Sequence, residues 1–521
     1  MKVIGYDVGT TGFKAGLYEV SQEDLRMLAG VCEHYNLHIL PNGGAEQDPG
    51  DWWNAMCRST KKLLEESGTA PGDVRAIACC SQFSTLVMVD RKGRALRPAM
   101  SCMDTRAAKQ FETYMGTGLR VEGLNVSKLL RFVRITGAAS LSAKDSIWRY
   151  HWVHDNEPEI FKQTYKWLDA KEYLTFRATG KTLASRDDAY ATFLYNVRKG
   201  CWSEELCRML DIRMEHLPEL CNSSDMVGEL LPGPAEELGL LPGTAVIAGG
   251  SDVSLCQVGS GCLRPGDVNI CSGTSGWVCT TVGHLCLDVS HSAASIVGAD
   301  PDTYLYCADC ETAGKCVEWG RDRLGGTALG SFDAMIDSVR SIPAGSNGVV
   351  FSPWMHGNRC PFEDANARGV FFNVDVDSHT GDLIKAVIEG VCLHMRWLLE
   401  TSELKVKTGA VVRFSGGSAM SKTICQILAD VLGREVETVE SPRYVGTLGA
   451  AALTAVSLGL LTDIKDIRKL IRVGAHFTPD PANTAVYDRI YPVFKELYRC
   501  NKKSFAALNA VPAAAEPAVT H

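Results

Sequence analysis

The sequence predicts an α/β protein built from two domains, on three observations. The chain has 521 residues, more than one hydrophobic core usually supports. Segments with strand and helix character alternate through most of its length, as they do in α/β proteins. A short strand that runs into a turn rich in glycine and hydroxyl side chains occurs in each half. We therefore expect a duplicated core with a cleft between its halves.

Composition narrows the kinds of partner that the chain can have. Apolar residues make up 45% and charged residues 22% of the chain, as in ordinary soluble proteins. The net charge of −8 and the pI near 5.9 argue against a nucleic-acid-binding surface, which would be basic. No apolar run is long enough to span a membrane, and no signal-peptide pattern opens the sequence. The sequence thus predicts a cytoplasmic protein that binds small molecules and keeps its 20 cysteines reduced.

The first element is a strand, a tight turn and a second strand at the N-terminus. Residues 3–6 form a short apolar strand, and Gly9 and Gly12 give the turn its backbone freedom. Alternating apolar side chains over residues 13–17 predict the second strand. A P-loop would instead continue from its lysine into a helix, so this is a different kind of phosphate-binding turn.

The chemistry of this turn predicts that it grips phosphate. Its backbone amides and the hydroxyls of Thr10 and Thr11 can surround anionic oxygens, and Lys14 adds a positive charge. Asp7 would repel phosphate unless a cation intervened, which indicates Mg²⁺ held between this carboxylate and phosphate oxygens. For the segment by itself, an ordinary glycine hairpin with an exposed lysine is the alternative interpretation.

A helix and a buried strand follow. Asp48 can cap a helix that has Pro49 in its first position. The apolar residues 74–80 predict a strand, and ligands collect beyond the carboxyl ends of parallel strands. The residues at that exit are therefore candidates for ligand contact, although a plain connecting turn explains them equally well: Gln82, Phe83 and Ser84.

The second half begins where the strand-like residues 245–248 run into the glycine-containing residues 249–252. We expect the domain junction here. The chain is thereby divided into domains 1–246 and 247–505, followed by a disordered tail over residues 506–521 that is rich in alanine and proline toward its end.

Two further turns repeat the pattern of the first. One follows an apolar strand and contains Gly273 and Thr274. The other contains Gly416 and Gly417 and leads into a segment with helical periodicity, residues 424–431. Glycine turns of this kind in both halves predict a nucleotide held in the cleft between them.

The order of these motifs resembles that of the FGGY family of carbohydrate kinases, with the xylulokinases as the most similar members. The likeness extends over roughly residues 1–455. The motifs that carry it are Asp7-x-Gly9-Thr10-Thr11-x-x-Lys14, Glu46-Gln47-Asp48-Pro49, Gly249-Gly250-Ser251-Asp252, Gly273-Thr274-Ser275-Gly276, Gly369-Val370-Phe371-Phe372 and Ser415-Gly416-Gly417.

This resemblance implies an actin-like ATPase fold, in which two ribonuclease-H-like domains close over ATP and a sugar. It implies ATP and Mg²⁺ as cofactors and Asp252 as the catalytic base; without the resemblance, Asp252 would be interpreted as a turn or capping residue. The residues that match the family's nucleotide motifs are Gly9, Thr10, Thr11 and Lys14 in the first phosphate motif, Gly273 and Thr274 in the second, Gly416, Gly417 and Ser421 at the adenosine, and Asp7 at the metal.

The positions expected to contact the sugar match the xylulokinases less well. The usual Gln-Met-His-Gly is replaced by Gln82, Phe83, Ser84 and a threonine, and of the usual Trp-Asn-Asp-x-Arg only Asp104 and Arg106 are kept. Because an unpaired buried hydroxyl costs about 1–3 kcal/mol, several such changes can turn a pentulose pocket toward another ligand.

The predicted function is transfer of the γ-phosphate of ATP to a hydroxyl of a ketose, first of all D-xylulose or a related pentulose. One alternative is a kinase of another polyol or small ketose, such as glycerol, erythritol or autoinducer-2. A less favoured alternative is a non-catalytic sugar-sensing ATPase switch, against which the retained Asp252 argues. Since many members of the family dimerise, a homodimer is an expectation by analogy.

Overall fold

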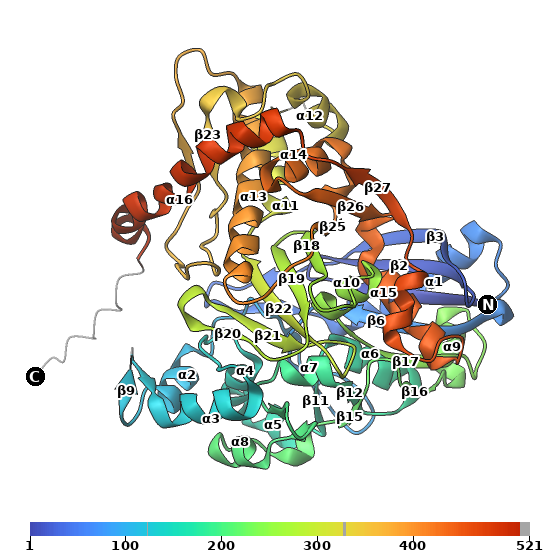
Figure 1. Cartoon of the computed structure of the whole chain (residues 1–521). Coiled ribbons are helices and arrows are strands. Elements are labelled where there is room, and N and C mark those ends of the chain that lie inside the picture. The colour runs from blue at the N-terminus through green and yellow to red at the C-terminus, as the bar shows by residue number, and fades with distance from the viewer. Residues whose placement is uncertain (122, 327–329, 511–521) are drawn as a thin grey trace, which may run out of the picture.

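The computed structural model describes residues 1–121, 123–326 and 330–510, and it contains two large mixed sheets with helices packed around them (Figure 1). The predicted α/β class with two domains is thereby confirmed. The first sheet consists, in spatial order, of β16 (Met226–Glu229), β17 (Ala245–Ser251), β6 (Val74–Ser81), β1 (Lys2–Val8), β2 (Gly12–Val20) and β3 (Leu25–His34). The second sheet consists of β20 (Leu287–Asp288), β21 (Ala293–Val297), β22 (Tyr304–Cys310), β19 (Gly276–Val282), β18 (Val268–Ser272), β25 (Val411–Ser415), β26 (Glu435–Val439) and β27 (Val473–Phe477).

The two sheets share one topology, which confirms the predicted duplication. In the first sheet, β1 and β2 pair antiparallel, β2 and β3 pair antiparallel, and β1, β6 and β17 run parallel, with β16 antiparallel beside them. In the second sheet, β18 and β19 pair antiparallel, β19 and β22 pair antiparallel, and β18, β25 and β26 run parallel, with β27 antiparallel beside them. The glycine turn between β1 and β2 therefore has its counterpart between β18 and β19.

Helices surround these sheets, and shorter elements fill the connections. The helices are α1 (Pro49–Ser67), α2 (Ala108–Met115), α3 (Val126–Thr136), α4 (Ser146–Asn156), α5 (Pro158–Gln163), α6 (Ala170–Thr179), α7 (Arg186–Tyr190), α8 (Glu204–Met209), α9 (Pro232–Leu238), α10 (Asp252–Gly259), α11 (Gly314–Trp319), α12 (Phe332–Val339), α13 (Thr380–Glu403), α14 (Lys422–Leu432), α15 (Val445–Ser457) and α16 (Pro481–Asn509). The short strands are β4 (His38–Ile39), β5 (Ala45–Gln47), β7 (Val87–Val89), β8 (Ala99–Met100), β9 (Arg120–Val121), β10 (Leu124–Asn125), β11 (Lys166–Leu168), β12 (Leu183–Ser185), β13 (Tyr195–Asn196), β14 (Cys201–Trp202), β15 (Glu219–Cys221), β23 (Val350–Ser352) and β24 (Val370–Phe372).

The predicted N-terminal elements are present. The hairpin closes where the Gly9 N–H donates to the Gly12 carbonyl at 2.9 Å. Helix α1 starts as expected, because Asp48 Oδ1 accepts the Gly50 N–H at 2.8 Å and Pro49 occupies the first helical position. These local signals lie within a few residues of one another, so the sequence alone contains them.

Helix α15 comes from the C-terminal half of the chain but packs on β1, β2 and β6 of the first sheet and on α10. Helix α15 approaches the first sheet and α10 so closely that each contact requires a glycine. A Cβ built at Gly5 would lie 2.1 Å from the Thr447 carbonyl oxygen, and one built at Gly449 would lie 2.0 Å from the Leu255 carbonyl oxygen. The C-terminal half of the chain thus packs directly on the first sheet through α15.

Two of the expected boundaries differ from the structure. The junction expected between residues 246 and 247 falls inside β17, which pairs with β6 up to Ser251, so the first sheet continues past it. Helix α16 extends to Asn509, so the first residues of the expected tail are helical. Residues 511–521, the rest of that expected tail, lie outside the described residues.

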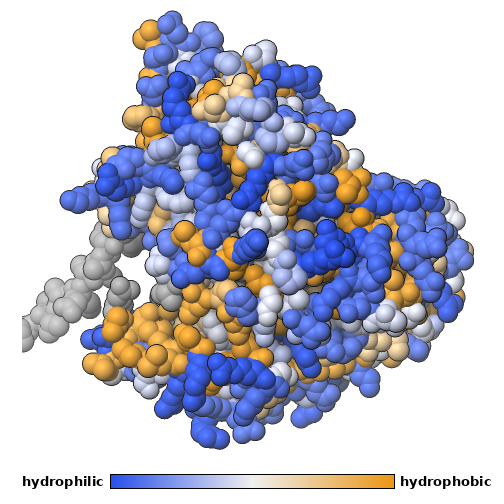
Figure 2. All heavy atoms as spheres, viewed as in Figure 1, coloured by the Kyte–Doolittle hydropathy of each residue, from blue (hydrophilic) through white to orange (hydrophobic). Residues whose placement is uncertain are grey.

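Hydrophilic side chains cover much of the face shown in Figure 2, and an apolar patch at its lower left lies over β9 and α3. Leu119, Val121 and Leu130 are exposed there. Among the described residues, no helix has both the length and the apolar character that a membrane crossing requires.

Candidate active site

The first glycine turn, residues 9–12, is fixed by hydrogen bonds from two side chains of the first domain. The Tyr35 hydroxyl donates to the carbonyls of Gly9 and Gly12, and the Gln47 side-chain amide donates to the Thr10 carbonyl at 2.8 Å. The carbonyl oxygens of the turn are therefore directed into the domain, while Thr11 at its tip is exposed. This arrangement leaves the tip available to a ligand.

Gln82, expected at the sugar, is buried and hydrogen-bonds to residues that adjoin or support this turn. Its backbone N–H donates to the Val8 carbonyl at 2.8 Å, and its side-chain amide donates to Gln47 Oε1 at 2.7 Å. Its own Oε1 is buried and has no hydrogen-bond partner among the described residues. Gln82 thus supports the first glycine turn through Gln47.

Three charged side chains gather beside the first glycine turn. Lys14 Nζ lies 2.8 Å from Asp7 Oδ2, and Asp252 lies near both. Asp252 is the first residue of α10, and its Oδ1 accepts the Val253 N–H at 2.8 Å. Burial, and next the negative charge of Asp7, raise the pKa of Asp252 to about 7, although the Val253 N–H and Lys14 act in the opposite direction. Two carboxylates and one lysine make a site whose net negative charge a cation would balance.

Helix α10 also reaches the second glycine turn, residues 272–276. Cys256 of α10 contacts Cys271, which immediately precedes that turn. The turn is closed by a hydrogen bond of 3.0 Å from the Gly273 N–H to the Ser275 carbonyl. Asp252 therefore stands on a helix that connects the two glycine turns, one from each domain.

The third glycine turn, residues 415–418, lies against the second because β18 and β25 are neighbours. A Cβ at Gly416 would lie 2.5 Å from the Ser272 carbonyl oxygen, and Ser272 Oγ is 2.8 Å from Ser418 Oγ. A Cβ at Gly417 would meet nothing within 4 Å, so this residue leaves open space beside the turn. The hydroxyl of Ser421, expected at the adenosine, accepts the Ile424 N–H as the N-cap of α14.

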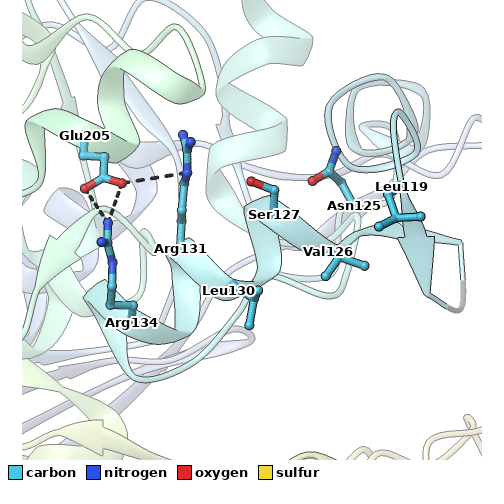
Figure 3. A pocket seen from close by; sticks show the side chains of 8 residues that line it. All are labelled: Leu119, Asn125, Val126, Ser127, Leu130, Arg131, Arg134 and Glu205. Carbon is cyan, nitrogen blue, oxygen red and sulfur yellow. Dashed lines mark hydrogen bonds and ion pairs between the residues drawn. The ribbon is translucent and has the colours of Figure 1, made fainter.

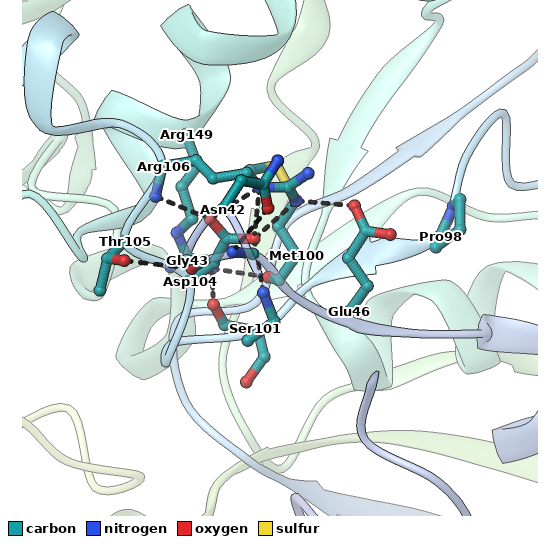
Figure 4. Close-up of polar contacts among 12 residues, drawn as sticks. Asn42, Gly43, Glu46, Pro98, Met100, Ser101, Asp104, Thr105, Arg106 and Arg149 are labelled. Atoms are coloured by element: carbon teal, nitrogen blue, oxygen red, sulfur yellow. Dashed lines mark hydrogen bonds and ion pairs between the residues drawn. The ribbon is translucent and has the colours of Figure 1, made fainter. Parts of the chain in front are cut away.

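Asp104 and Arg106, expected at the sugar, lie inside the first domain in a network of ion pairs (Figure 4). Arg106 Nη2 is 2.6 Å from both Asp104 Oδ2 and Glu46 Oε1, and Asp104 Oδ2 also accepts the Ala45 N–H. Asp104 has no exposed surface, and the Arg106 side chain is 6% exposed and stacks over Trp152. In this arrangement the pair fixes the segment around β5, because Asp104 bonds the Ala45 N–H and Arg106 pairs with Glu46.

Ser84 and Phe83 also make contacts within the protein. The Ser84 carbonyl and hydroxyl accept from Arg149 Nη2 at 2.5 and 3.1 Å, and Ser84 has a positive φ of 61°. Arg149 is fully buried and also donates to the carbonyls of Met100 and Ser101. Arg149 was not among the predicted site residues, and its one signal in the sequence is that it is the single arginine of α4, between Trp148 and Tyr150. Phe83 packs into a small apolar cluster with Tyr190 and with Val297 of the second domain.

A separate surface hollow of about 520 Å³ lies at α3 and contains none of the expected site residues (Figure 3). Its charged lining is paired, because Arg134 lies 2.6 Å from Glu205 and Arg131 lies 3.9 Å from it. The hollow is thus distinct from the glycine turns.

A duplicated α/β fold with a glycine turn in each half and a carboxylate between them defines the class of actin-like, ATP-dependent phosphotransferases. The chain belongs to the FGGY family of carbohydrate kinases, whose N-terminal domain matches residues 2–259 and whose C-terminal domain matches residues 268–458. The expected family, fold class and ATP-dependent carbohydrate kinase activity are thereby confirmed.

Individual relatives are similar over nearly the whole chain. The chain is 28% identical to a xylulose kinase of Bacillus subtilis over 98% of its own length and 99% of that protein. It is 26% identical, with a TM-score of 0.84, to a ligand-bound xylulose kinase from Lactobacillus acidophilus, covering 97% of this chain and 99% of that one. A gluconate kinase from Lactobacillus acidophilus matches with the same identity, TM-score and coverage.

Proposed function

We propose that this protein transfers the γ-phosphoryl group of ATP to a hydroxyl of a ketose, with D-xylulose or a related pentulose as the first candidate. The observation that carries the proposal is the position of Asp252 beside Asp7 and Lys14, on the helix that connects the two glycine turns. The names of the similar proteins in Bacillus subtilis and Lactobacillus acidophilus favour xylulose.

In this proposal, Asp252 is the general base that takes the proton of the attacking hydroxyl. A base whose pKa is about 7 accepts a proton readily near neutral pH. Since phosphoryl transfer has a loose transition state, the main tasks of the protein are to align the hydroxyl with the γ-phosphorus and to stabilise the phosphate oxygens. Lys14 contributes positive charge there, and closure of the domains keeps water from competing as acceptor.

The remaining roles follow the family motifs. We assign the phosphates to the first and second glycine turns, with Gly9, Thr10 and Thr11 on one side and Gly273 and Thr274 on the other. We assign the adenosine to the third glycine turn, where the open space beside Gly417 supports the assignment, and to the adjoining Ser421. Mg²⁺ fits beside Asp7, because the negative charge of this buried carboxylate raises the pKa of Asp252. A hard divalent cation there would relieve the repulsion between the two carboxylates. When bound, it would also neutralise charge on the phosphate oxygens.

A sugar acid is a second candidate for the acceptor. The thiol of Cys102, which occupies the place of the usual tryptophan, lies near enough to Arg149, Asp252 and Arg359 for their charges to affect its pKa. Arg359 is paired with Asp309 at 3.1 Å, but Arg149 has no ion-pair partner among the described residues, and its positive charge favours an acceptor that carries a carboxylate. A gluconate kinase is also among the similar structures.

A coupled assay of ADP release tests the proposal. D-xylulose, other ketopentoses, ketohexoses, polyols and gluconate are compared at matched concentration with MgATP. We expect one ketopentose to give the highest kcat/KM, and gluconate to exceed it only if the second candidate is correct. ADP release at the same rate with and without every acceptor would contradict the proposal and favour an ATPase switch.

A further inference from the structure

Asp187 contacts the turn between β17 and α10, the helix that begins with Asp252. It belongs to α7 and is buried, with 1% of its surface exposed. Its Oδ2 accepts the Ser251 N–H at 2.8 Å and the Ser251 hydroxyl at 3.2 Å. Because Ser251 is the N-cap of α10, one oxygen of Asp187 holds the residue immediately before Asp252.

The other oxygen of Asp187 fixes the carboxylate itself. Oδ1 accepts the hydroxyls of Ser185 and of Ser223, the latter at 3.2 Å. The four donors come from three separate segments of the chain, and both oxygens are satisfied. A carboxylate bonded in this way has one orientation, and it transmits that orientation to whatever it holds.

The turn between β17 and α10 has no room to move away from Asp187. A Cβ built at Gly250 would lie 2.5 Å from Asp187 Oδ2. On the other side, Gly249 has a φ of 71°, and a Cβ there would lie 1.8 Å from the Cys79 carbonyl oxygen in β6. Since the turn is enclosed between the β6 backbone and Asp187, any displacement of this carboxylate displaces Ser251 and, with it, Asp252.

We propose that Asp187 is a positioning residue for phosphoryl transfer, which acts through Ser251 to hold Asp252 at the acceptor hydroxyl. The inference rests on the proposed function, because it assumes that Asp252 is the base. Its basis is that hydrogen-bond geometry, and not the charge of Asp187, sets the direction of Asp252. Misplacement of a catalytic group by about 1 Å costs on the order of 100-fold in rate, so the effect is measurable.

Two substitutions separate geometry from charge. In Asp187→Asn the side-chain oxygen can still accept from Ser251, while the amide group donates to the hydroxyls of Ser185 and Ser223, which can also accept. In Asp187→Glu the charge is kept, but one extra methylene pushes the carboxylate into the Gly250 turn. We expect the Asn variant to keep kcat within about threefold and the Glu variant to lose about 10- to 100-fold, both with KM for MgATP and for the acceptor unchanged.

Asp430→Glu is the matched control. Asp430 is also buried, with 2% of its surface exposed, and its Oδ1 accepts the Asp480 N–H at 2.8 Å and the Gln426 amide at 2.7 Å. It lies in the second domain, near the end of α14. The same lengthening there should lower the melting temperature but leave kcat unchanged, which separates positioning from a general loss of stability.

The result that would overturn the inference is a Glu variant with the kcat of the wild type, or an equal loss of kcat in the Asn and Glu variants. If the Glu variant does not fold, Ser251→Ala decides. A lower kcat at unchanged KM supports the positioning role, and an unchanged kcat overturns it. A failure of the proposed function has a different result, because the wild type itself would then release no additional ADP with any acceptor.

Discussion

At position 252 the local environment sets the protonation state of one side chain. Burial and the Asp7 carboxylate disfavour the ionised form, and together they raise the pKa of Asp252 to about 7. Because only the ionised form can accept a proton, kcat/KM for the acceptor should fall about tenfold per pH unit below the pKa of Asp252, which Mg²⁺ beside Asp7 would lower from about 7. Initial rates measured across a series of buffers at constant ionic strength would show this limb, and a flat profile down to about pH 5 would contradict it.

Replacing the same carboxylate should separate binding from chemistry. We expect Asp252→Asn to keep its affinity for MgATP, measured by calorimetry, and to lose roughly 10²- to 10⁴-fold in sugar phosphorylation, the range of a lost general base. Near-normal turnover would exclude Asp252 as the base.

Asp252→Asn should also change how the stability of the folded protein depends on pH. Since the pKa of Asp252 in the folded protein lies above its ordinary value of 3.8, ionisation costs stability as the pH rises from about 4 to about 7. The Asn variant should therefore melt at a higher temperature than the wild type at pH 8, and the difference should vanish near pH 4.

The residues at the expected sugar site show what a motif can and cannot predict. Asp104 and Arg106 were expected there from their match to the family's Trp-Asn-Asp-x-Arg pattern, but Glu46 and Trp152, which complete their network, lie 60 and 46 residues from Arg106 in the sequence. Asp187 was not among the predicted site residues, because its partner Ser251 lies 64 residues further along the chain. Local patterns identify candidate side chains, and only the fold shows which of them face each other.

Among the elements, the contact between α10 and α15 is the one most sensitive to added volume. A Cβ at Gly449 would lie 2.0 Å from a backbone oxygen of α10, which cannot move without shifting the helix that starts at Asp252. We expect Gly449→Ala to lower the free energy of unfolding by about 1–3 kcal/mol, the usual cost of overpacking, and to lower kcat.

A glycine in open space provides the control for that substitution. A Cβ at Gly233, in α9, would meet nothing within 4 Å. Gly233→Ala should change the free energy of unfolding by no more than about 1 kcal/mol, in the stabilising direction, because alanine favours helix. Chemical denaturation of both variants checks the pair, and equal effects would contradict the role assigned to the helix contact.

Elements with local signals were predicted well, and those fixed by distant partners were not. The hairpin β1–β2 and the start of α1 depend on glycines, alternation and a cap within a few residues. The position of α15 depends on β1, more than 400 residues earlier, and its mostly apolar sequence has no polar face that would indicate where it packs. The division at residue 246 missed the end of the first sheet for the same reason, since strand pairing set that end.

For the whole molecule, contacts between the domains bear on catalysis because the proposed mechanism requires closure. One such contact is an ion pair: Lys144, in the first domain, lies 3.8 Å from Glu311, which follows β22 in the second. The side chains are 43% and 26% exposed, so the pair contributes no more than about 1 kcal/mol. Its removal should therefore favour the open form by at most about fivefold.

The limit of about fivefold on the shift toward the open form predicts how far KM for the acceptor can rise. If closure completes the acceptor site, Lys144→Gln should raise KM for the acceptor by up to about fivefold while kcat stays within about twofold, because the groups around Asp252 are unchanged. Raising the ionic strength should weaken the pair in the wild type and raise its KM toward that of the variant, whose KM should depend less on salt. Steady-state kinetics of both proteins at low and high salt would check this. A large loss of kcat in the variant would show instead that Lys144 takes part in the chemistry, and an identical salt dependence in the two proteins would show that the pair does not hold the domains together.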